Sequence, residues 1–268
     1  MKKQQNKITE VGEGENNNEK LFGIVGYPLE HSLSKAFFEK KFAMENIENV
    51  SFENFPIKHI VNWKLFLLMA EMKKTLCGFN VTIPFKEEIM PFLDAVSDIA
   101  EEVGAVNVVK IDRNSEKGKF LGYNTDVLGF EKSLLEHKQA KHHSALVFGT
   151  GGAAKAVVYV LKKLNIDYQF VSRQSKNNTL TYEVLDKKTI ENNLLLINTT
   201  PLGMFPNTDT CPPIDYTAIG KDHFLFDLVY NPTETLFLKK GKKQGAKTQN
   251  GYDMLCYQAE EAWQIWNE

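Results

Sequence analysis

Two residues of opposite charge stand where they could transfer a proton. Lys86 ends the stretch Asn80-Val-Thr-Ile-Pro-Phe-Lys86, and Asp126 ends Asn124-Thr-Asp126. An ammonium and a carboxylate that meet in a cleft hold each other in place, and such a pair can give a proton to a reacting oxygen and take it back. Each has an ordinary alternative: Lys86 could be a solvated residue in the first turn of a helix, and Asp126 could cap a helix that starts near Val127.

Neutral polar side chains are expected around this pair, near the ends of predicted strands. Ser32 and Ser34 follow one strand, Asn80 and Thr82 alternate at the end of another, and Asn107 begins a third. Open α/β sheets bind ligands at the carboxyl ends of their strands, and neutral hydrogen-bonding groups suit a small polyol better than a phosphorylated or bulky apolar substrate. Alternatively, either serine could be a helix N-cap, and Asn80 and Thr82 could simply lie on a strand edge.

The segment Gly149-Thr-Gly-Gly-Ala-Ala154 has the spacing of a dinucleotide-binding loop. It matches G-x-G-x-x-A through Gly149, Gly151 and Ala154, between a predicted strand and a predicted helix. Small residues there permit a tight turn, let backbone amides approach a pyrophosphate and allow the helix to pack closely on the strand. The alternative is a turn that needs small residues only for packing.

The segment after the next predicted strand favours NADP over NAD. An NAD-binding protein usually has an acidic residue there for the ribose 2′-hydroxyl, but this chain has Ser172-Arg173-Gln174-Ser175-Lys176. Of the 32 Lys and Arg residues only Arg113 and Arg173 are arginine, so lysine supplies the general surface charge and an arginine needs a specific reason. The guanidinium fork suits a 2′-phosphate, although Arg173 could also be a solvated residue after a strand.

The elements that must position these residues alternate between strands and helices in both halves of the chain. The first half predicts strands at 21–26, 50–55, 76–83 and 106–112 and helices at 33–46, 59–74 and 84–103, the last with a break near residue 94. The second half predicts strands at 144–149, 168–172, 194–199 and 224–230 and helices at 153–164, near 181–190 and at 251–266. This alternation predicts an α/β fold with mostly parallel sheets, the second of Rossmann type.

Length and composition predict two domains. A chain of 268 residues with 43% hydrophobic residues exceeds the usual size of one domain. We expect a disordered tail at 1–20, a substrate-binding catalytic domain at 21–123 plus 251–268, and an NADP-binding domain at 124–250. The final helix would then return to the first domain.

The bulk properties also exclude several kinds of partner. The formal net charge of -2 offers no basic field for nucleic acid or an anionic membrane. Polar residues follow Lys2 and Lys3 where a signal peptide would be apolar, and no apolar run approaches ~18 residues, so we expect a soluble, cytoplasmic protein, as monomer or homodimer. Three dispersed cysteines argue against a disulfide framework, and no histidine pattern indicates a metal site.

Taken in order, these motifs resemble those of the shikimate dehydrogenases. The corresponding segments are His31 to Ser34, Asn80 to Lys86, Gly104 to Asn107, Asn124 to Asp126, Gly149 to Ala153, and the late Gln258. Six matches in the family's order span about 245 residues, which is far more specific than a glycine loop alone.

The resemblance implies an NADP-dependent reduction of 3-dehydroshikimate to shikimate in aromatic amino acid biosynthesis. It makes Lys86 and Asp126 the catalytic pair. Implied substrate-binding residues are Ser32, Ser34, Asn80, Thr82, Lys86, Asn107, Asp126, Tyr230 and Gln258. Implied cofactor-binding residues are Gly149, Thr150, Gly151, Gly152, Ala153, Ser172, Arg173, Asn198, Thr199, Thr200 and Gly251.

Two alternatives stay open. One is a quinate/shikimate dehydrogenase of the same family that accepts NAD and the additional hydroxyl of quinate. The other is a catalytically silent relative that binds a metabolite or cofactor as a sensor, against which the intact Lys86 and Asp126 argue.

Overall fold

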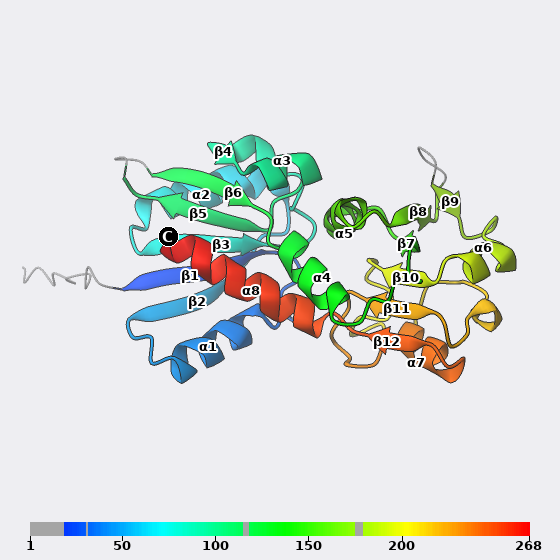
Figure 1. Cartoon of the computed structure of the whole chain (residues 1–268). Helices are drawn as coiled ribbons and strands as arrows, with labels where there is room; N and C mark the ends of the chain where they lie inside the picture. Colours follow the sequence, from blue (N-terminus) through cyan, green and yellow to red (C-terminus); the bar gives the residue numbers. More distant parts are fainter. Residues whose placement is uncertain (1–18, 31, 115–117, 175–178) are drawn as a thin grey trace, which may run out of the picture.

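A computed structural model describes residues 19–30, 32–114, 118–174 and 179–268. The described chain forms two six-stranded sheets, each flanked by helices (Figure 1). The α/β fold with two sheets was predicted, with four strands in each. Two helices lie side by side between the sheets, α4 (Asp126–Leu135) and α8 (Tyr252–Asn267). Gly129 of α4 permits this close approach, because a Cβ there would stand 2.7 Å from the carbonyl oxygen of Met254.

The first sheet has the strand order β2-β1-β3-β5-β6-β4. Its strands are β1 (Lys20–Gly26), β2 (Val50–Pro56), β3 (Leu76–Val81), β4 (Ala95–Val96), β5 (Val108–Asp112) and β6 (Lys119–Tyr123). β1 pairs in parallel with β2 and β3, and β4 with β6, whereas β5 runs antiparallel to both of its neighbours. The sheet is therefore parallel at three of its five pairings.

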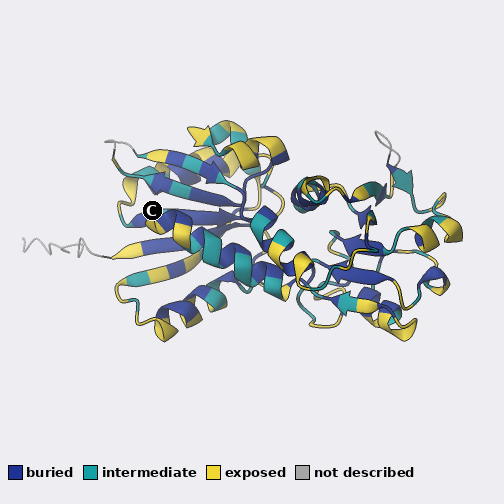
Figure 2. Cartoon of the chain, viewed as in Figure 1, coloured by how far each residue is buried: buried dark blue, intermediate teal, exposed yellow. Residues whose placement is uncertain are grey.

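Alternating residues of β1 bury their side chains on opposite faces of this sheet. Phe22 and Ile24 join a core with α1 (Ser34–Met44) and α8, while Leu21 and Val25 join a core with α2 (Trp63–Met72). Figure 2 shows the central strands of both sheets as largely buried and the outer strands as more exposed. This period of two is what the alternation of side chains along a strand requires.

The C-terminal helix returns to the first sheet, as predicted. Trp266 of α8 stacks on Phe22 with ring centroids 4.8 Å apart, and its indole nitrogen donates to the carbonyl oxygen of Val109 at 3.0 Å. A Cβ at Gly78 would lie 2.5 Å from this indole. The first sheet is thus completed by residues about 240 positions later in the chain than β1.

The second sheet is parallel throughout, with the order β12-β11-β10-β7-β8-β9. Its strands are β7 (Ser144–Phe148), β8 (Asp167–Ser172), β9 (Leu180–Thr181), β10 (Leu195–Asn198), β11 (Phe224–Asp227) and β12 (Lys247–Gln249). Its helices are α5 (Gly152–Lys163), α6 (Lys187–Asn192) and α7 (Leu236–Lys243), with a 3-10 turn at Tyr216–Ala218. The central strands are fully buried apolar runs, as expected of a parallel sheet covered on both faces.

The helix predicted at 84–103 was wrong over most of its length. After β3 the chain forms turns, a 3-10 turn at Met90–Phe92 and the short strand β4, and only α3 (Asp98–Val103) is helical. The carbonyl oxygen of Lys86 accepts the N–H of Val106 at 2.7 Å instead of one four residues further along. Phe85 and Ile89 are fully buried, so tertiary contacts fix this segment as a turn.

Several smaller elements were missed. β6 continues the first sheet as a hairpin with β5, and β12 extends the second sheet beside β11. The helix α7 precedes β12, and no element was predicted for either segment. The helix predicted near 181–190 is the shorter α6. The tail predicted at 1–20 lies mostly outside the described residues, but its last residue, Lys20, begins β1 by pairing with Val50. None of the described helices combines the length and apolar character of a membrane span.

Arg113, one of the two arginines, closes the C-terminal end of α2. Its guanidinium donates to the carbonyl oxygens of Ala70 at 2.7 Å, Glu71 at 3.1 Å, Lys73 at 3.1 Å and Leu76 at 3.0 Å. The last carbonyls of a helix have no partner within the helix, and a cation there also opposes the negative end of the helix dipole. Burial lowers the pKa of Arg113, but the group stays charged at neutral pH.

We expect Arg113→Ala to lower the free energy of unfolding by about 2 to 3 kcal/mol, because several half-buried carbonyls lose a charged donor. Arg113→Lys keeps the charge but cannot reach several acceptors at once, so it should recover less than half of the loss. Urea unfolding of the three proteins measures both. A lysine variant as stable as the wild type would show that charge alone matters at this helix end.

Candidate functional site

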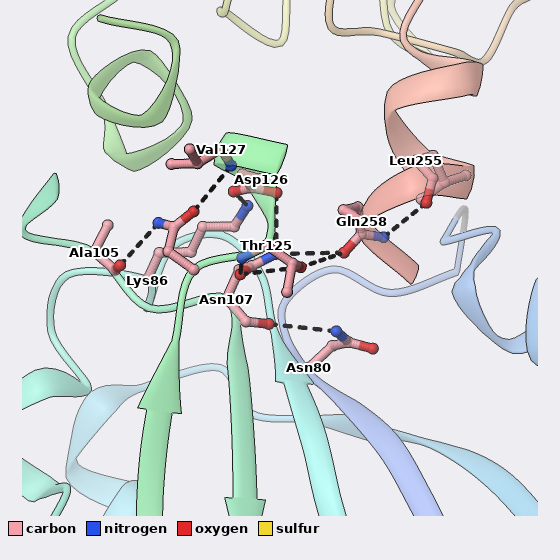
Figure 3. Close-up of polar contacts among 10 residues, drawn as sticks. Asn80, Lys86, Ala105, Asn107, Thr125, Asp126, Val127, Leu255 and Gln258 are labelled. Carbon is pink, nitrogen blue, oxygen red and sulfur yellow. Dashed lines mark hydrogen bonds and ion pairs between the residues drawn. The ribbon is translucent and has the colours of Figure 1, made fainter. Parts of the chain in front are cut away.

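Lys86 and Asp126 form an ion pair, as predicted (Figure 3). The ammonium nitrogen lies 2.6 Å from Oδ2 of Asp126, and the two side chains are 15% and 7% exposed. Lys86 stands on the turn after β3, and Asp126 is the first residue of α4. The cap that α4 would need comes from elsewhere, because Oδ1 of Asn124 accepts the N–H of Val127, so Asp126 is free of the capping role considered above.

Asn107 fixes the orientation of the carboxylate. Its Oδ1 accepts the backbone N–H of Thr125 at 2.7 Å, which turns Nδ2 toward Oδ1 of Asp126 at 3.1 Å. Nδ2 also lies 3.0 Å from Oγ1 of Thr125 and 3.3 Å from Oε1 of Gln258. Each oxygen of Asp126 therefore has a donor of its own, and both donors come from the first sheet's side.

Thr125 was missing from the predicted site residues, although it lies inside the Asn-Thr-Asp motif. It is 1% exposed, and its backbone and side chain both contact Asn107. Its position between two motif residues, Asn124 and Asp126, could have identified it from the sequence. Thr125 therefore holds Asn107 in place, and its hydroxyl also donates to Oε1 of Gln258 at 3.4 Å.

Asn80 offers an unused acceptor beside this network. Its Nδ2 donates to the carbonyl oxygen of Asn107 at 3.4 Å, but its buried Oδ1 has no hydrogen-bond partner among the described residues. A buried carbonyl oxygen without a partner costs free energy, and a hydroxyl of a bound polyol would satisfy it. Thr82 follows β3 with a half-buried side chain, and Gln258 reaches the same cluster from α8.

The two predicted serines lie beside Tyr230. Oγ of Ser32 accepts the N–H of Ser34 at 3.3 Å, and α1 begins at Ser34 without any side-chain cap. The hydroxyl of Tyr230, on the loop after β11, has the backbone of Leu33 as its hydrogen-bond partner. Burial raises the pKa of Tyr230, so its hydroxyl stays protonated and joins the serine hydroxyls as a neutral donor set suited to a carboxylate. His31 lies outside the described residues.

The glycine loop joins β7 to α5, as predicted. Gly149 has φ +107°, and a Cβ there would lie 2.6 Å from Oγ1 of Thr199, so glycine is required on both counts. A Cβ at Gly151 would meet nothing within 4 Å, which leaves the amides at the start of α5 open to a ligand. Thr150 and Ala153 complete this turn and first helical turn.

Lys86 faces this same helix start. A Cβ at Gly152, the first residue of α5, would stand 3.2 Å from Cβ of Lys86 and 3.6 Å from Cβ of Ala105. Lys155 of α5 also bonds with Glu87 at 2.5 Å, next to Lys86. The structure therefore brings the candidate proton donor against the loop predicted to bind the cofactor.

The segment Asn198 to Thr200 supports the glycine loop mainly through buried contacts. Thr199 donates to the carbonyl oxygen of Phe148 through both its N–H and its hydroxyl. The Asn198 side chain is fully buried, donates to Oδ1 of Asp227 at 2.9 Å and accepts from Thr200. The Asn198 side chain thus points inward, and the half-buried residues of this segment are Thr199 and Thr200.

Gly251 also has a packing role. A Cβ there would lie 2.1 Å from the carbonyl oxygen of Leu228, and its N–H donates to the carbonyl oxygen of Val229 at 3.2 Å. Gly251 is the N-cap residue of α8 and so allows the chain to leave β12 next to the segment that carries Tyr230.

Arg173 lies directly after β8 and is exposed to solvent. Within the described part of the chain its guanidinium has no hydrogen bond or salt bridge. Ser172 turns its hydroxyl to the backbone of Gln174, and the charge of Arg173 acts on the nearby Tyr182. Ser175 and Lys176 lie outside the described residues.

Asp227 is a fully buried carboxyl that the sequence did not reveal. It accepts from Asn198, from the N–H of Val229 at 3.0 Å and from the hydroxyl of Thr235 at 2.5 Å. Burial away from water raises its pKa to about 7, and these hydrogen bonds oppose the rise. The carboxyl joins the ends of β10 and β11 to the start of α7, where Thr235 caps the helix.

The raised pKa of Asp227 predicts a pH-dependent stability. Because the pKa is higher in the folded protein than in the unfolded chain, the neutral carboxyl favours folding, and stability is lost as the pH rises from about 4 toward about 7. We expect the wild type to lose about 2 to 3 kcal/mol of unfolding free energy, relative to Asp227→Asn, when the pH rises from 5 to 8. Denaturant titrations at both pH values measure this. A difference that does not change with pH would contradict the raised pKa.

Comparison with known proteins gives a consistent result. A family model described as the shikimate dehydrogenase substrate binding domain matches residues 24–109. A relative from Methanococcus aeolicus named shikimate dehydrogenase (NADP(+)) is 37% identical over 276 residues, covering 94% of this chain and 93% of the relative.

Two solved structures share the two-sheet arrangement. A shikimate dehydrogenase in complex with NADP+ superposes with a TM-score of 0.81 at 34% identity, covering 94% of this chain and 91% of that one. The enzyme of Thermus thermophilus, in complex with NADP(H) and shikimate, gives a TM-score of 0.80 at 28% identity and covers 92% and 93% of the two chains.

Proposed function

The chain belongs to the shikimate dehydrogenase family, and we propose that the residues around Lys86 and Asp126 carry out its reaction. It is an NADP-dependent oxidoreductase that reversibly reduces 3-dehydroshikimate to shikimate, a step of aromatic amino acid biosynthesis. The observation that carries the site assignment is the buried ion pair, placed against the start of the glycine-loop helix.

We assign NADP binding to the second sheet and substrate binding to the first. Strands of the first sheet lie between residues 20 and 123, and those of the second between 144 and 249. This division supports a substrate-binding domain of residues 21–123 plus 251–268 and a cofactor-binding domain of 124–250. The helices α4 and α8 connect the two.

The described residues fit NADP. The amides at Gly151 and Gly152 are open to a pyrophosphate at the positive end of α5, and Arg173 is available to a 2′-phosphate. Thr199 and Thr200 stand beside the loop and can contact the cofactor farther along. When bound, NADP supplies or accepts the hydride, and the protein handles the proton.

The substrate contacts follow from the polarity of the first site. We assign the carboxylate of the substrate to the hydroxyls of Ser32, Ser34 and Tyr230. The ring hydroxyls are assigned to the amide and hydroxyl groups of Asn80, Thr82, Asn107 and Gln258. Unlike a phosphate or an apolar ring, a carboxylated polyol uses both sets at once.

Lys86 handles the proton in this proposal. In the reductive direction its ammonium donates a hydrogen bond to the substrate carbonyl and gives up the proton as the oxygen becomes a hydroxyl. Asp126 holds the ammonium in position and accepts a hydrogen bond from Asn107, so the carboxylate does not turn away. In the reverse direction neutral Lys86 takes the proton back.

A spectrophotometric assay tests the function and separates it from its rival. NADPH and NADH are each supplied with 3-dehydroshikimate and with 3-dehydroquinate, and oxidation is followed by absorbance. We expect the highest kcat/KM with NADPH and 3-dehydroshikimate. Preference for NADH or for the quinate substrate would support the alternative within the family, and no turnover with any combination would support a silent relative.

Lys86→Ala should lower kcat by about 10²- to 10⁴-fold with a smaller change in KM, since it removes a group needed only as the proton moves. Asp126→Asn should resemble it, and the double variant should lose less than the product of the two losses, because the residues act as one unit. Steady-state kinetics of the wild type, the two single variants and the double variant complete this double-mutant cycle. Near-normal kcat in Lys86→Ala would remove the lysine from the mechanism.

Arg173→Ala should raise KM for NADP by about 10-fold to 150-fold, because the variant loses one or more charge-assisted hydrogen bonds to the 2′-phosphate. NAD lacks that phosphate, so its KM should hardly change. Arg173→Lys serves as the matched control that keeps charge without the fork and should fall between the two. Equal losses with both cofactors would assign Arg173 to the fold instead.

A further inference from the structure

The turn that carries Lys86 is tied to the second sheet by a neighbouring ion pair. Glu87 follows Lys86, and its Oε2 lies 2.5 Å from Nζ of Lys155 on α5. Among the described residues, the ion pairs that join the segment before residue 124 to the segment 124–250 are this one and Lys86–Asp126. None of the substrate, proton or cofactor contacts proposed above uses Glu87 or Lys155.

Lys155 occupies a position where α5 itself does not favour a cation. Its backbone N–H makes the first hydrogen bond of the helix, to the carbonyl oxygen of Gly151 at 3.1 Å. The start of a helix carries a partial positive charge, and the first turn of α5 holds no acidic residue that would offset it. The charge of Lys155 therefore gains its stabilisation from groups outside the helix.

These groups lie on the first sheet's side of the molecule. One is the carboxylate of Glu87. The other is the C-terminal end of α3, where a Cβ at Gly104 would lie 3.7 Å from Nζ of Lys155. The end of a helix has carbonyl groups without partners and a partial negative charge. Lys155 thus reaches from a helix of the second sheet to two groups of opposite charge on the side of the first sheet.

The same face of α5 limits how close Lys86 can come. Gly152 is three residues before Lys155, so the two residues lie on one face of the helix. A Cβ at Gly152 would stand 3.2 Å from Cβ and 3.7 Å from Cδ of Lys86. The turn therefore meets α5 at two points, a close contact at Gly152 that stops further approach and an attractive contact at Lys155 that opposes separation.

We propose that Glu87 and Lys155 are positioning residues, which hold the turn of Lys86 against the start of α5 while substrate and NADP are bound. This role rests on the proposed function, because Lys86 must stand at the substrate carbonyl while the hydride comes from a cofactor at the start of α5. The two groups belong to different sheets, so contacts between the sheets set their separation. A displacement of about 1 Å between reacting groups is costly, and an ion pair that touches neither ligand restricts such displacements.

Removing either partner should lower the efficiency of the reaction without weakening cofactor binding. The two side chains are 37% and 42% exposed, so the effect should be that of an exposed ion pair. Glu87→Gln and Lys155→Met should each lower kcat/KM for 3-dehydroshikimate by about 2- to 5-fold at saturating NADPH and low salt. The double variant should lose no more than the larger single loss, because either change already breaks the pair. The Kd of NADPH alone, measured by fluorescence titration, should not change.

Salt provides a second measurement of the same pair. Raising the NaCl concentration from about 20 mM to about 500 mM shortens the Debye length from roughly 20 Å to roughly 4 Å, which screens an exposed pair. The ratio of kcat/KM between the wild type and the double variant should therefore fall toward one. A ratio that is the same at both salt concentrations would contradict an electrostatic contact.

Two matched variants serve as controls and should keep the kcat/KM of the wild type. Glu88→Gln removes an exposed charge next to Glu87 that has no ion pair among the described residues. Lys163→Met breaks another ion pair of α5, which joins Lys163 to Glu131 of α4 at 2.8 Å. Circular dichroism spectra that match the wild type show that each variant is folded.

Three further results would each overturn the proposal. Wild-type kcat/KM in both Glu87→Gln and Lys155→Met, or losses that multiply in the double variant, would show that the two residues do not act as a pair. An equal loss in Glu88→Gln would assign the effect to net charge beside Lys86. Weaker NADPH binding in Lys155→Met but not in Glu87→Gln would make Lys155 a ligand of the cofactor phosphates.

The activity of the wild type separates this proposal from the proposed function. A wild type that reduces neither 3-dehydroshikimate nor 3-dehydroquinate with either cofactor would remove both. An active wild type whose Glu87 and Lys155 variants are unaffected would remove only the positioning role.

Discussion

The site depends on keeping a buried carboxylate charged and correctly oriented. Asp126 is nearly removed from water, and an ionised carboxylate in such surroundings is stable only when donors replace the lost hydration. Lys86 satisfies Oδ2 and Asn107 satisfies Oδ1. Asn107 can do this only because Thr125 fixes its amide, and Gln258 closes the cluster from the C-terminal helix. The ion pair thus requires four separate segments of the chain to meet.

This requirement explains why α4 and α8 lie between the two sheets. α4 begins with Asp126, and α8 carries Gln258, so their contact at Gly129 fixes the distance between two members of the cluster. The other ends of these helices lead into the second sheet, where Gly251 packs on Leu228 beside the loop of Tyr230. A shift of the second sheet would therefore move Tyr230 relative to the polar residues on the first sheet's side, such as Asn80 and Asn107.

The sequence predicted most of the fold because periodicity reports burial. Most long helices and buried strands were found, and so was the return of the C-terminal helix, whose apolar spacing required a surface to cover. The helix α4 was expected only as a possible helix start near Val127, and β6 was missed. Short elements such as β4 and β12 escaped, since two or three residues carry no period. The turn at Lys86 was mistaken for a helix because its local sequence allows one, and the competing hydrogen bond from Val106 depends on a segment twenty residues away.

The candidate site was predicted unevenly for the same reason. Residues proposed to contact a ligand directly, such as Lys86 and the glycine loop, carry recognisable chemistry in their type and spacing. Supporting residues do not: Asp227 looks like any strand-terminal acid in the sequence, yet it is completely buried and connects three loops through its hydrogen bonds.

Scarce residue types gave a better signal. With lysine supplying nearly all the positive charge, each arginine needed a geometric reason, and Arg113 has one in the four carbonyls at the end of α2. Lysine could not have replaced it, because only a planar fork reaches several carbonyls from one side chain. The same argument supports Arg173 as a ligand for a phosphate, since a fork without a partner among the described residues is of use only when a ligand supplies the acceptors.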